Sequence, residues 1–268
     1  HNSGVVHTGV YYRPGSLKAR LCVAGAREMI AYCRERGLPL AVPGKVIVAA
    51  QEAERDGLEA IHRRGGQNGV EGLRWLDAGE LREREPAVRG VAALLVPTAA
   101  IVDYAAVARS YAAEIEAAGG TVRLDCAAGG FGQDGAAVVV ETSRGAVRAK
   151  QVVNCAGLYA DRIAILAGSR AARHEFAVFP FRGEYYELQA AAAARVRGLI
   201  YPVPDPRFPF LGVHFTPRVH GGVEAGPSAV LAWRREGYRR TDWDAREMAT
   251  MLGYAGFWAM AARYWRKG

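Results

Sequence analysis

The chain has 268 residues, of which half are hydrophobic and 23% are charged, a balance typical of a globular protein with one large domain or two intertwined ones. No apolar run approaches the ~20 residues that a membrane span needs, and no segment has a signal-peptide pattern, so we expect a soluble, cytoplasmic protein. The net charge of +8 comes from scattered arginines, which argues against a nucleic-acid-binding protein and leaves peripheral contact with anionic lipid at the inner face of the membrane open.

The first hundred residues alternate between helical and strand patterns. Ser16 has the character of an N-cap, and apolar residues at helical spacing predict a helix that ends near Gly37. Asp77 is expected to cap a brief helix that ends before Pro86. Short apolar runs predict strands over 45–50, 73–76 and 91–96, and a second helix is predicted over 53–64.

The second part of the chain begins with the pattern of an α/β layer. Asp103 caps a predicted helix, two glycines close it, and a predicted strand over 121–127 follows. Pro and Gly turns between apolar runs over 176–230 predict an antiparallel sheet. The other elements predicted here are three β-rich runs within 136–157, a helix over 158–168 and a helical tail from Asp244.

Residues 130–135, "GFGQDG", fit the G-x-G-x-x-G spacing of a dinucleotide-binding fingerprint. A functional fingerprint lies between a strand and a helix, because the N-terminus of that helix holds the pyrophosphate. Here the β-branched run "AAVVVET" follows, and Gln-Asp-Gly is typical of a hairpin turn. We therefore predict a hairpin at this position and not a nucleotide site.

The stretch "VVNCAGLYADR" (152–162) is a better candidate for contact with a nucleotide. A short apolar run leads into Asn-Cys-Ala-Gly, after which a helix is predicted. The small residues Ala156 and Gly157 would let the backbone approach a ligand, with helix N–H groups behind them. Plain close packing of a strand on a helix gives the same pattern and is the equal alternative.

Three polar side chains in apolar surroundings are candidates for substrate binding or catalysis. His7 follows an apolar pair in a Gly/Ser-containing loop, and His214 lies in the predicted strand "LGVHFT", where alternation does not settle which face it occupies. Arg182 follows Phe181 and requires an anion or an aromatic face, because burying an unpaired charge is costly. A purely structural role is the alternative for both histidines.

The cysteines lack the spacing that is typical of metal sites, so we predict reduced thiols and no metal ion. They are Cys22, Cys33, Cys126 and Cys155.

Five stretches taken together resemble the L-2-hydroxyglutarate dehydrogenase (oxidase) family of the FAD-dependent, D-amino-acid-oxidase-like oxidoreductases. The resemblance runs nearly from end to end, and residues 201–218 are specific to this subgroup. The stretches are "HNSGVVHTGVYYRPGSLKARLC", "IVDYAAVA", "NCAGLYADR", "PFRGEYY" and "YPVPDPRFPFLGVHFTPR".

The resemblance implies an α/β (α+β) fold in which a Rossmann-type FAD-binding domain is interleaved with a substrate domain built on a mixed or antiparallel sheet. In this family the true G-x-G-x-x-G precedes the "HNSG" loop, and a Gly-Asp segment lies beyond the position of Gly268, so we expect a fragment truncated at both ends. The expected domains are 1–40 and 90–172 for FAD, 41–89 and 173–243 for substrate, and 244–268 as an incomplete helical tail.

The resemblance also implies FAD as the cofactor and assigns residues to it. Residues 2–4 would wrap the flavin, and one backbone position would contact its adenine end. The cofactor-binding residues are thus Asn2, Ser3, Gly4, Ala128 (adenine end), Ala156 and Gly157.

On the substrate side, the implied reaction is oxidation of L-2-hydroxyglutarate to 2-oxoglutarate by hydride transfer from C2 to the flavin, with oxygen or a quinone as electron acceptor. His214 is the expected base, with His7 as its rival, and Arg182 would hold a carboxylate. Tyr185 and Thr216 would also face the substrate. An amine or amino-acid oxidase of the same superfamily and an inactive fragment are the alternatives.

Overall fold

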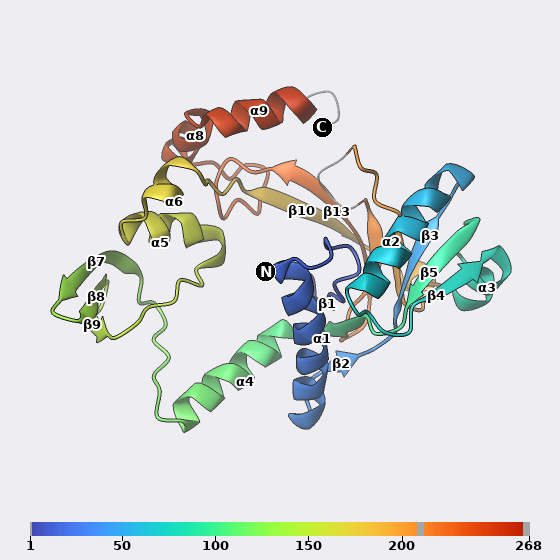
Figure 1. Ribbon diagram of the computed structural model, residues 1–268, viewed down its shortest axis with the longest axis horizontal. Coiled ribbons are helices and arrows are strands. Elements are labelled where there is room, and N and C mark those ends of the chain that lie inside the picture. Colours follow the sequence, from blue (N-terminus) through green and yellow to red (C-terminus); the bar gives the residue numbers. More distant parts are fainter. Residues whose placement is uncertain (1, 208–211, 265–268) are drawn as a thin grey trace. The chain divides into compact units, whose positions relative to one another are not determined.

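The computed structural model describes residues 2–207 and 212–264, and its packing divides the chain into two compact units (Figure 1). Unit 1 comprises residues 1–114 and 183–229, and unit 2 comprises 115–182 and 230–268. His1 of the "HNSG" loop and residues 208–211 of the family-specific stretch lie outside the described residues. Helices and several sheets occur together, so the prediction of a mixed α/β fold is confirmed.

A mixed seven-stranded sheet holds most of the strand residues of unit 1. The neighbours β11 and β3 run parallel, whereas β3–β5, β5–β4, β11–β12 and β12–β13 are antiparallel. The sheet is therefore mixed and not purely antiparallel. In sheet order its strands are β10 (Phe181–Glu187), β13 (Val223–Leu231), β12 (His214–Pro217), β11 (Leu199–Pro202), β3 (Lys45–Ala49), β5 (Ala92–Val96) and β4 (Arg74–Asp77).

The two faces of this sheet pack against different helices. On one face Ile47 belongs to a core with Leu58 and Ile61 of α2, and on the other face Val48 packs with Leu81 of α3. Every residue of β3 and β5 is buried, which explains why both strands, apart from Lys45 at the start of β3, are continuous apolar runs without alternation. The helices of unit 1 are α1 (Leu17–Glu35), the short η1 (Glu52–Glu54), α2 (Arg55–Gln67), α3 (Ala78–Arg84), α4 (Tyr104–Ala117, whose last turn enters unit 2) and α7 (Ala190–Ala193).

A smaller sheet carries α1 and the first turns of α4. Its antiparallel strands are arranged in the order β1–β6–β2, and a separate core of buried apolar residues joins it to the two helices. That core includes Val6, Ala26, Cys33, Val102 and Val107. The strands are β1 (Val5–Val6), β6 (Ala100–Val102) and β2 (Leu40–Ala41).

Three predicted N-caps are confirmed in unit 1. The Oγ of Ser16 accepts the N–H of Ala19 at 3.2 Å and caps α1. Asp77 accepts two first-turn N–H groups of α3, and Asp103 accepts two of α4. Each cap satisfies backbone donors that have no partner within their own helix.

Unit 2 contains a three-stranded antiparallel sheet in which the "GFGQDG" stretch forms a hairpin. The strand β7 (Ala128–Asp134) pairs with β8 (Ala137–Thr142), and Gly135 in the turn has a φ of +59°. The prediction of a hairpin at 130–135 is confirmed. The other elements of unit 2 are β9 (Gly145–Ala149), η2 (Gly157–Tyr159), α5 (Ala160–Leu166), α6 (Arg170–His174), α8 (Ala245–Leu252) and α9 (Ala255–Tyr264).

Two predicted strands are wrong, and both lack a partner strand. Residues 121–127 are irregular. The β7–β8 ladder begins only at Ala128, which pairs with Thr142, the last residue of β8. Residues 151–154 are irregular and exposed, with Val153 83% exposed. A β-rich sequence forms a strand only where a neighbour satisfies its backbone groups, and none pairs here among the described residues.

The packing units are cut at different points from the predicted functional domains. The boundaries fall after residues 114, 182 and 229, whereas the expected FAD and substrate domains were bounded at 40, 89, 172 and 243. The functional division concerns which residues hold each ligand and stays a prediction. None of the described helices has the length and apolar character that a membrane crossing requires.

Candidate active site

The centre of the candidate site is a stack of two rings on neighbouring strands of unit 1. Ile200 of β11 pairs with Phe215 of β12, so the antiparallel register sets Tyr201 opposite His214. The two rings stack with centroids 3.9 Å apart and planes inclined by 18°. Thr216, two residues further on, shares this face and forms a hydrogen bond with Tyr201. His214 and Thr216 are thus buried on one face, while Phe215 packs on the other, which settles the orientation that the sequence left open.

The imidazole of His214 is held in one tautomer. Its Nδ1 lies 3.0 Å from the carbonyl oxygen of Gly212, and because a carbonyl can only accept, Nδ1 carries the proton. Nε2 then has a free lone pair. Burial lowers the pKa of His214, the charge of Lys45 lowers it further, and the bond to Gly212 partly offsets both effects. The ring is therefore neutral and able to accept a proton at Nε2.

Lys45, the first residue of β3, is a member of the site that the sequence analysis missed. Its side chain is only 1% exposed, and its ammonium lies 4.7 Å from the ring centroid of Tyr11 and 4.9 Å from that of Tyr201. Burial lowers the pKa of this lysine to about 8. The sequence did contain an indication of this role: a lysine begins the otherwise apolar run "KVIVAA", and a lysine in a buried strand is unusual.

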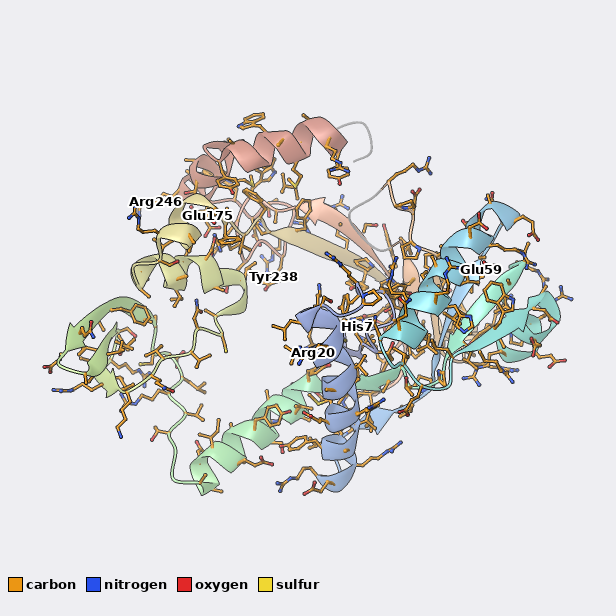
Figure 2. All side chains as sticks on the ribbon, viewed as in Figure 1. His7, Arg20, Glu59, Glu175, Tyr238 and Arg246 are labelled. Atoms are coloured by element: carbon orange, nitrogen blue, oxygen red, sulfur yellow. The ribbon has the colours of Figure 1, made fainter. Side chains whose placement is uncertain are left out.

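His7 joins the site from the loop between β1 and α1 (Figure 2). The thiol of Cys22 on α1 donates to the carbonyl of His7 at 3.1 Å, and the amide of Asn68 donates to the carbonyls of Gly9 and Tyr12. Two helices thus fix the loop. Burial, then the charge of Lys45, then His214 lower the pKa of His7 to about 4, so this second imidazole is also neutral near pH 7.

Tyr185 borders the same group of side chains from β10. A Cβ on Gly226 would come within 2.7 Å of its ring, and Gly226 is the β13 residue that pairs with His214. Tyr185 is 43% exposed, so it lies at the rim of the site, whereas the hydroxyl of Tyr201 is buried and its pKa is raised to about 12. We call this group the Lys45 cluster; it comprises the buried Lys45, Tyr201 and His214 and the half-buried His7 and Tyr11.

The structure therefore brings together His7, His214, Thr216 and Tyr185, which the sequence analysis had assigned to the substrate. Arg182 belongs to unit 2, where its guanidinium donates to the carbonyl oxygen of Arg239 at 3.0 Å and of Gly237 at 3.5 Å. These carbonyl oxygens satisfy some of the hydrogen-bond donors of the half-buried guanidinium. Its role in holding a carboxylate stays a prediction.

The predicted flavin-wrapping residues form a tight exposed turn ahead of β1. The side chain of Asn2 accepts the N–H of Gly4 at 2.9 Å, and Ser3 accepts that of Val5 at 3.3 Å. Gly4 has a φ of +67°, a conformation that favours glycine, and its carbonyl accepts the N–H of Val102. The side chains of Asn2 and Ser3 therefore shape this loop, and contact with a cofactor would come mainly from its backbone.

The other predicted cofactor residues lie in unit 2. Ala156 and Gly157 are exposed, and Gly157 has a φ of +54° with no atom within 4 Å of a Cβ built on it. Asn154 holds this turn by accepting the N–H of Ala156 at 3.1 Å. Ala128 lies at the first pair of the β7–β8 ladder, next to a bulge. Small residues and open backbone at these positions fit a dinucleotide.

Comparison with known proteins gives a consistent family. A model described as FAD dependent oxidoreductase matches residues 1–262. The L-2-hydroxyglutarate dehydrogenase of Indibacter alkaliphilus is 43% identical over 268 residues, which cover 100% of this chain and 67% of the relative. The mitochondrial L-2-hydroxyglutarate dehydrogenase of Mus musculus is 45% identical over 96% of this chain and 57% of the relative. The chain thus spans between 57% and 67% of the length of these two relatives.

Solved structures share the fold. The dithionite-reduced L-alpha-glycerophosphate oxidase from Mycoplasma pneumoniae with FAD bound has a TM-score of 0.79 and 26% identity, over 94% of this chain and 66% of that chain. Glycine oxidase from Geobacillus kaustophilus has a TM-score of 0.71 and 21% identity, over 85% of this chain and 60% of that chain.

Proposed function

Because the chain belongs to the FAD dependent oxidoreductase family, we propose that it contributes to a flavoenzyme that oxidises L-2-hydroxyglutarate to 2-oxoglutarate. Relatives named L-2-hydroxyglutarate dehydrogenase, 43% and 45% identical over almost the whole chain, support this substrate. The observation that carries the chemistry is the ring of Tyr201, which stacks on His214 with centroids 3.9 Å apart and also lies 4.9 Å from the buried ammonium of Lys45. A site for an α-hydroxy acid needs a base for the hydroxyl proton and a cation for the carboxylate, and the Lys45 cluster contains both.

Bound FAD would supply the acceptor for the hydride at C2 of the substrate. Asn2, Ser3, Gly4, Ala128, Ala156 and Gly157 would hold this cofactor. The residues of the chain supply the rest of the chemistry: they orient the substrate and take the proton that its hydroxyl loses as the C2 carbonyl forms.

His214 is the base in this proposal. Its Nδ1–H is committed to the carbonyl of Gly212, so Nε2 receives the hydroxyl proton, and the stacked ring of Tyr201 keeps the imidazole in plane. His7 is the rival, and its pKa is lowered to about 4 because burial, Lys45 and His214 all oppose a cation there, whereas the bond to Gly212 favours the cation at His214. Tyr185 and Thr216 would border the substrate, and Arg182 would bind a carboxylate.

The test is the visible spectrum of the purified protein after incubation with excess FAD and desalting. We expect retained flavin bands that L-2-hydroxyglutarate bleaches under anaerobic conditions, while its D-enantiomer, glycine and sarcosine do not. Bleaching by the amino acids alone would replace the proposal with an amine oxidase. A colourless protein would show that this chain by itself is inactive.

Two further features complete the proposal. Oxygen and a quinone are the two classes of electron acceptor, and a comparison of turnover in air with anaerobic turnover on a soluble quinone distinguishes them.

Peripheral membrane contact is suggested by the net charge of +8. It predicts that the protein sediments with vesicles of anionic lipid and is released when salt is added.

A further inference from the structure

Within the part of the chain that the structure describes, Lys45 is a buried cation without an anionic partner. Only 1% of its side chain is exposed, and no carboxylate among the residues that the structure describes forms an ion pair with it. The nearby thiol of Cys22 does not serve as an anion, because burial raises its pKa and its Sγ donates to the carbonyl of His7. A charge in such a place is costly, so proteins keep one mostly where it meets a ligand.

The groups around Lys45 form a setting that only a ligand would complete. Its ammonium faces the rings of Tyr11 and Tyr201, which attract a cation but do not neutralise it. The hydroxyl of Tyr11 is buried and has no hydrogen-bond partner among the described residues. Tyr201 lies close enough to Tyr11 to add to the rise that burial causes in the pKa of the Tyr11 hydroxyl. Two aromatic walls, a cation and an orphaned hydroxyl donor together suit an anionic oxygen.

The position of Lys45 selects which oxygen it would meet. Tyr201 comes from β11, the strand between β3 with Lys45 and β12 with His214, and its ring contacts both of those side chains. If Nε2 of His214 receives the proton of the C2 hydroxyl, the carboxylate on the same carbon is the anion within reach of the ammonium. We propose that Lys45 binds the C1 carboxylate of the substrate, an inference that rests on the function proposed above.

This assignment makes the site specific for 2-hydroxy acids. An ammonium beside the base holds the acid group next to the reacting carbon and sets the C2 hydroxyl against the imidazole. Replacing the C1 carboxylate by an uncharged amide would remove the ion pair, whereas the same change at C5 would leave it intact. Lys45 is thus a specificity-determining residue, and the proposal predicts that its effect depends on C1 alone.

The experiment measures flavin reduction in the FAD-loaded enzyme with L-2-hydroxyglutarate, its C1-amide and its C5-amide. Lys45→Met keeps the apolar stem and removes the charge. Lys18→Met is the matched control, because the ammonium of Lys18 lies 4.6 Å from the ring centroid of Tyr12 but on the exposed surface. Bound FAD, measured from its absorbance, verifies that each variant is folded.

We expect Lys45→Met to lower kcat/KM for L-2-hydroxyglutarate by about 10- to 100-fold, as for the loss of a hydrogen bond to a charged group. The same variant should oxidise the C1-amide as fast as the unchanged enzyme does. It should also discriminate between L-2-hydroxyglutarate and the C5-amide to the same extent as the unchanged enzyme. Lys18→Met should change none of the three rates.

Three outcomes would overturn the proposal. Lys45→Met could retain the full preference for the acid over its C1-amide, or lose the preference at C5 instead, or bind less FAD while the fraction that holds FAD keeps the substrate preference of the unchanged enzyme. An unchanged enzyme that holds FAD but does not react with L-2-hydroxyglutarate would remove the proposed function and this inference with it. An active enzyme with an unchanged C1 preference in Lys45→Met would remove the inference alone.

Discussion

The ring of Tyr201 stacks on the imidazole of His214 with centroids 3.9 Å apart, and the same tyrosine ring carries the ammonium of Lys45 at 4.9 Å. One aromatic side chain therefore lies against both the proposed base and the proposed carboxylate-binding group. Its place on β11, between β12 and β3, follows from the order of the strands in the mixed sheet. The register of that sheet thus sets the spacing of the site.

Replacing His214 with Gln should slow flavin reduction by L-2-hydroxyglutarate by about 10²- to 10⁴-fold, the range for loss of a general base. Gln can keep a bond to the carbonyl of Gly212 but cannot take up the hydroxyl proton. Stopped-flow absorbance at the flavin band measures the rate. The control is His62→Gln, because His62 packs on Trp75 away from this cluster. A rate unchanged in His214→Gln and reduced in His7→Gln would assign the base to His7.

Acid should destabilise the protein through His7. Its pKa is about 4 in the folded state against 6.5 ordinarily, so between these values the unfolded chain binds more protons. The contribution of His7 is complete above pH 6.5 and is lost as the pH falls towards 4, a change of about 3 kcal/mol in the free energy of unfolding. Urea unfolding at pH 7 and pH 4.5 tests this in the unchanged protein and in His7→Gln, whose pH dependence should be weaker. An equal change in the free energy of unfolding between pH 7 and pH 4.5 in the two proteins would contradict the role of His7.

Removing the charge of Lys45 should stabilise the fold at neutral pH. The fall of its pKa from 10.5 to about 8 corresponds to a cost of about 3 kcal/mol for keeping the lysine charged, which exceeds the ~2 kcal/mol of a desolvated cation–π contact. Lys45→Met should therefore raise the free energy of unfolding by about 1 kcal/mol at pH 7.

The pH dependence gives a second measure of the same lysine. In the unchanged protein the free energy of unfolding should rise between pH 8 and pH 10.5, since the unfolded chain holds the lysine proton more tightly in that window. Lys45→Met should lack this rise, so above pH 10.5 the variant should be no more stable than the unchanged protein. Chemical unfolding across this range is the measurement, and a variant less stable at pH 7 would indicate a structural role for the charge.

Unit 2 depends on a buried ion pair between Asp161 and Arg235. Their side chains are 8% and 7% exposed, and two hydrogen bonds of 2.6 and 2.7 Å join them. Asp161→Asn leaves the guanidinium without its anion, so we expect a loss of about 3 to 5 kcal/mol in the free energy of unfolding.

The matched control for this pair lies in the same unit. Asp134 and Arg148 are also 2.6 Å apart but are 58% and 64% exposed, so Asp134→Asn should cost under about 1 kcal/mol. Thermal unfolding of the two Asp→Asn variants compares a buried pair, joined by two hydrogen bonds, with an exposed pair that has the same shortest distance of 2.6 Å. Equal losses would show that burial does not decide the contribution.

The sequence by itself determined several local features of the fold and the family. The caps at Ser16, Asp77 and Asp103 and the turn chemistry of "GFGQDG" are interactions between near neighbours in the chain, so short stretches specify them. The motif resemblance to FAD-dependent oxidoreductases is likewise carried by contiguous residues and agrees with the match over residues 1–262.

Tertiary structure decided which of these residues meet. Nothing local indicates that Lys45, Tyr201 and His214 share one face, because β3 lies far from β11 and β12 in the chain and only the order β3–β11–β12 makes them neighbours. For the same reason residues 121–127 and 151–154 have strand-like sequences but no strand: pairing requires a partner that local propensity does not supply. The burial that keeps both histidines neutral is also a property of the assembled sheet and its covering loop, and no single stretch of sequence contains it.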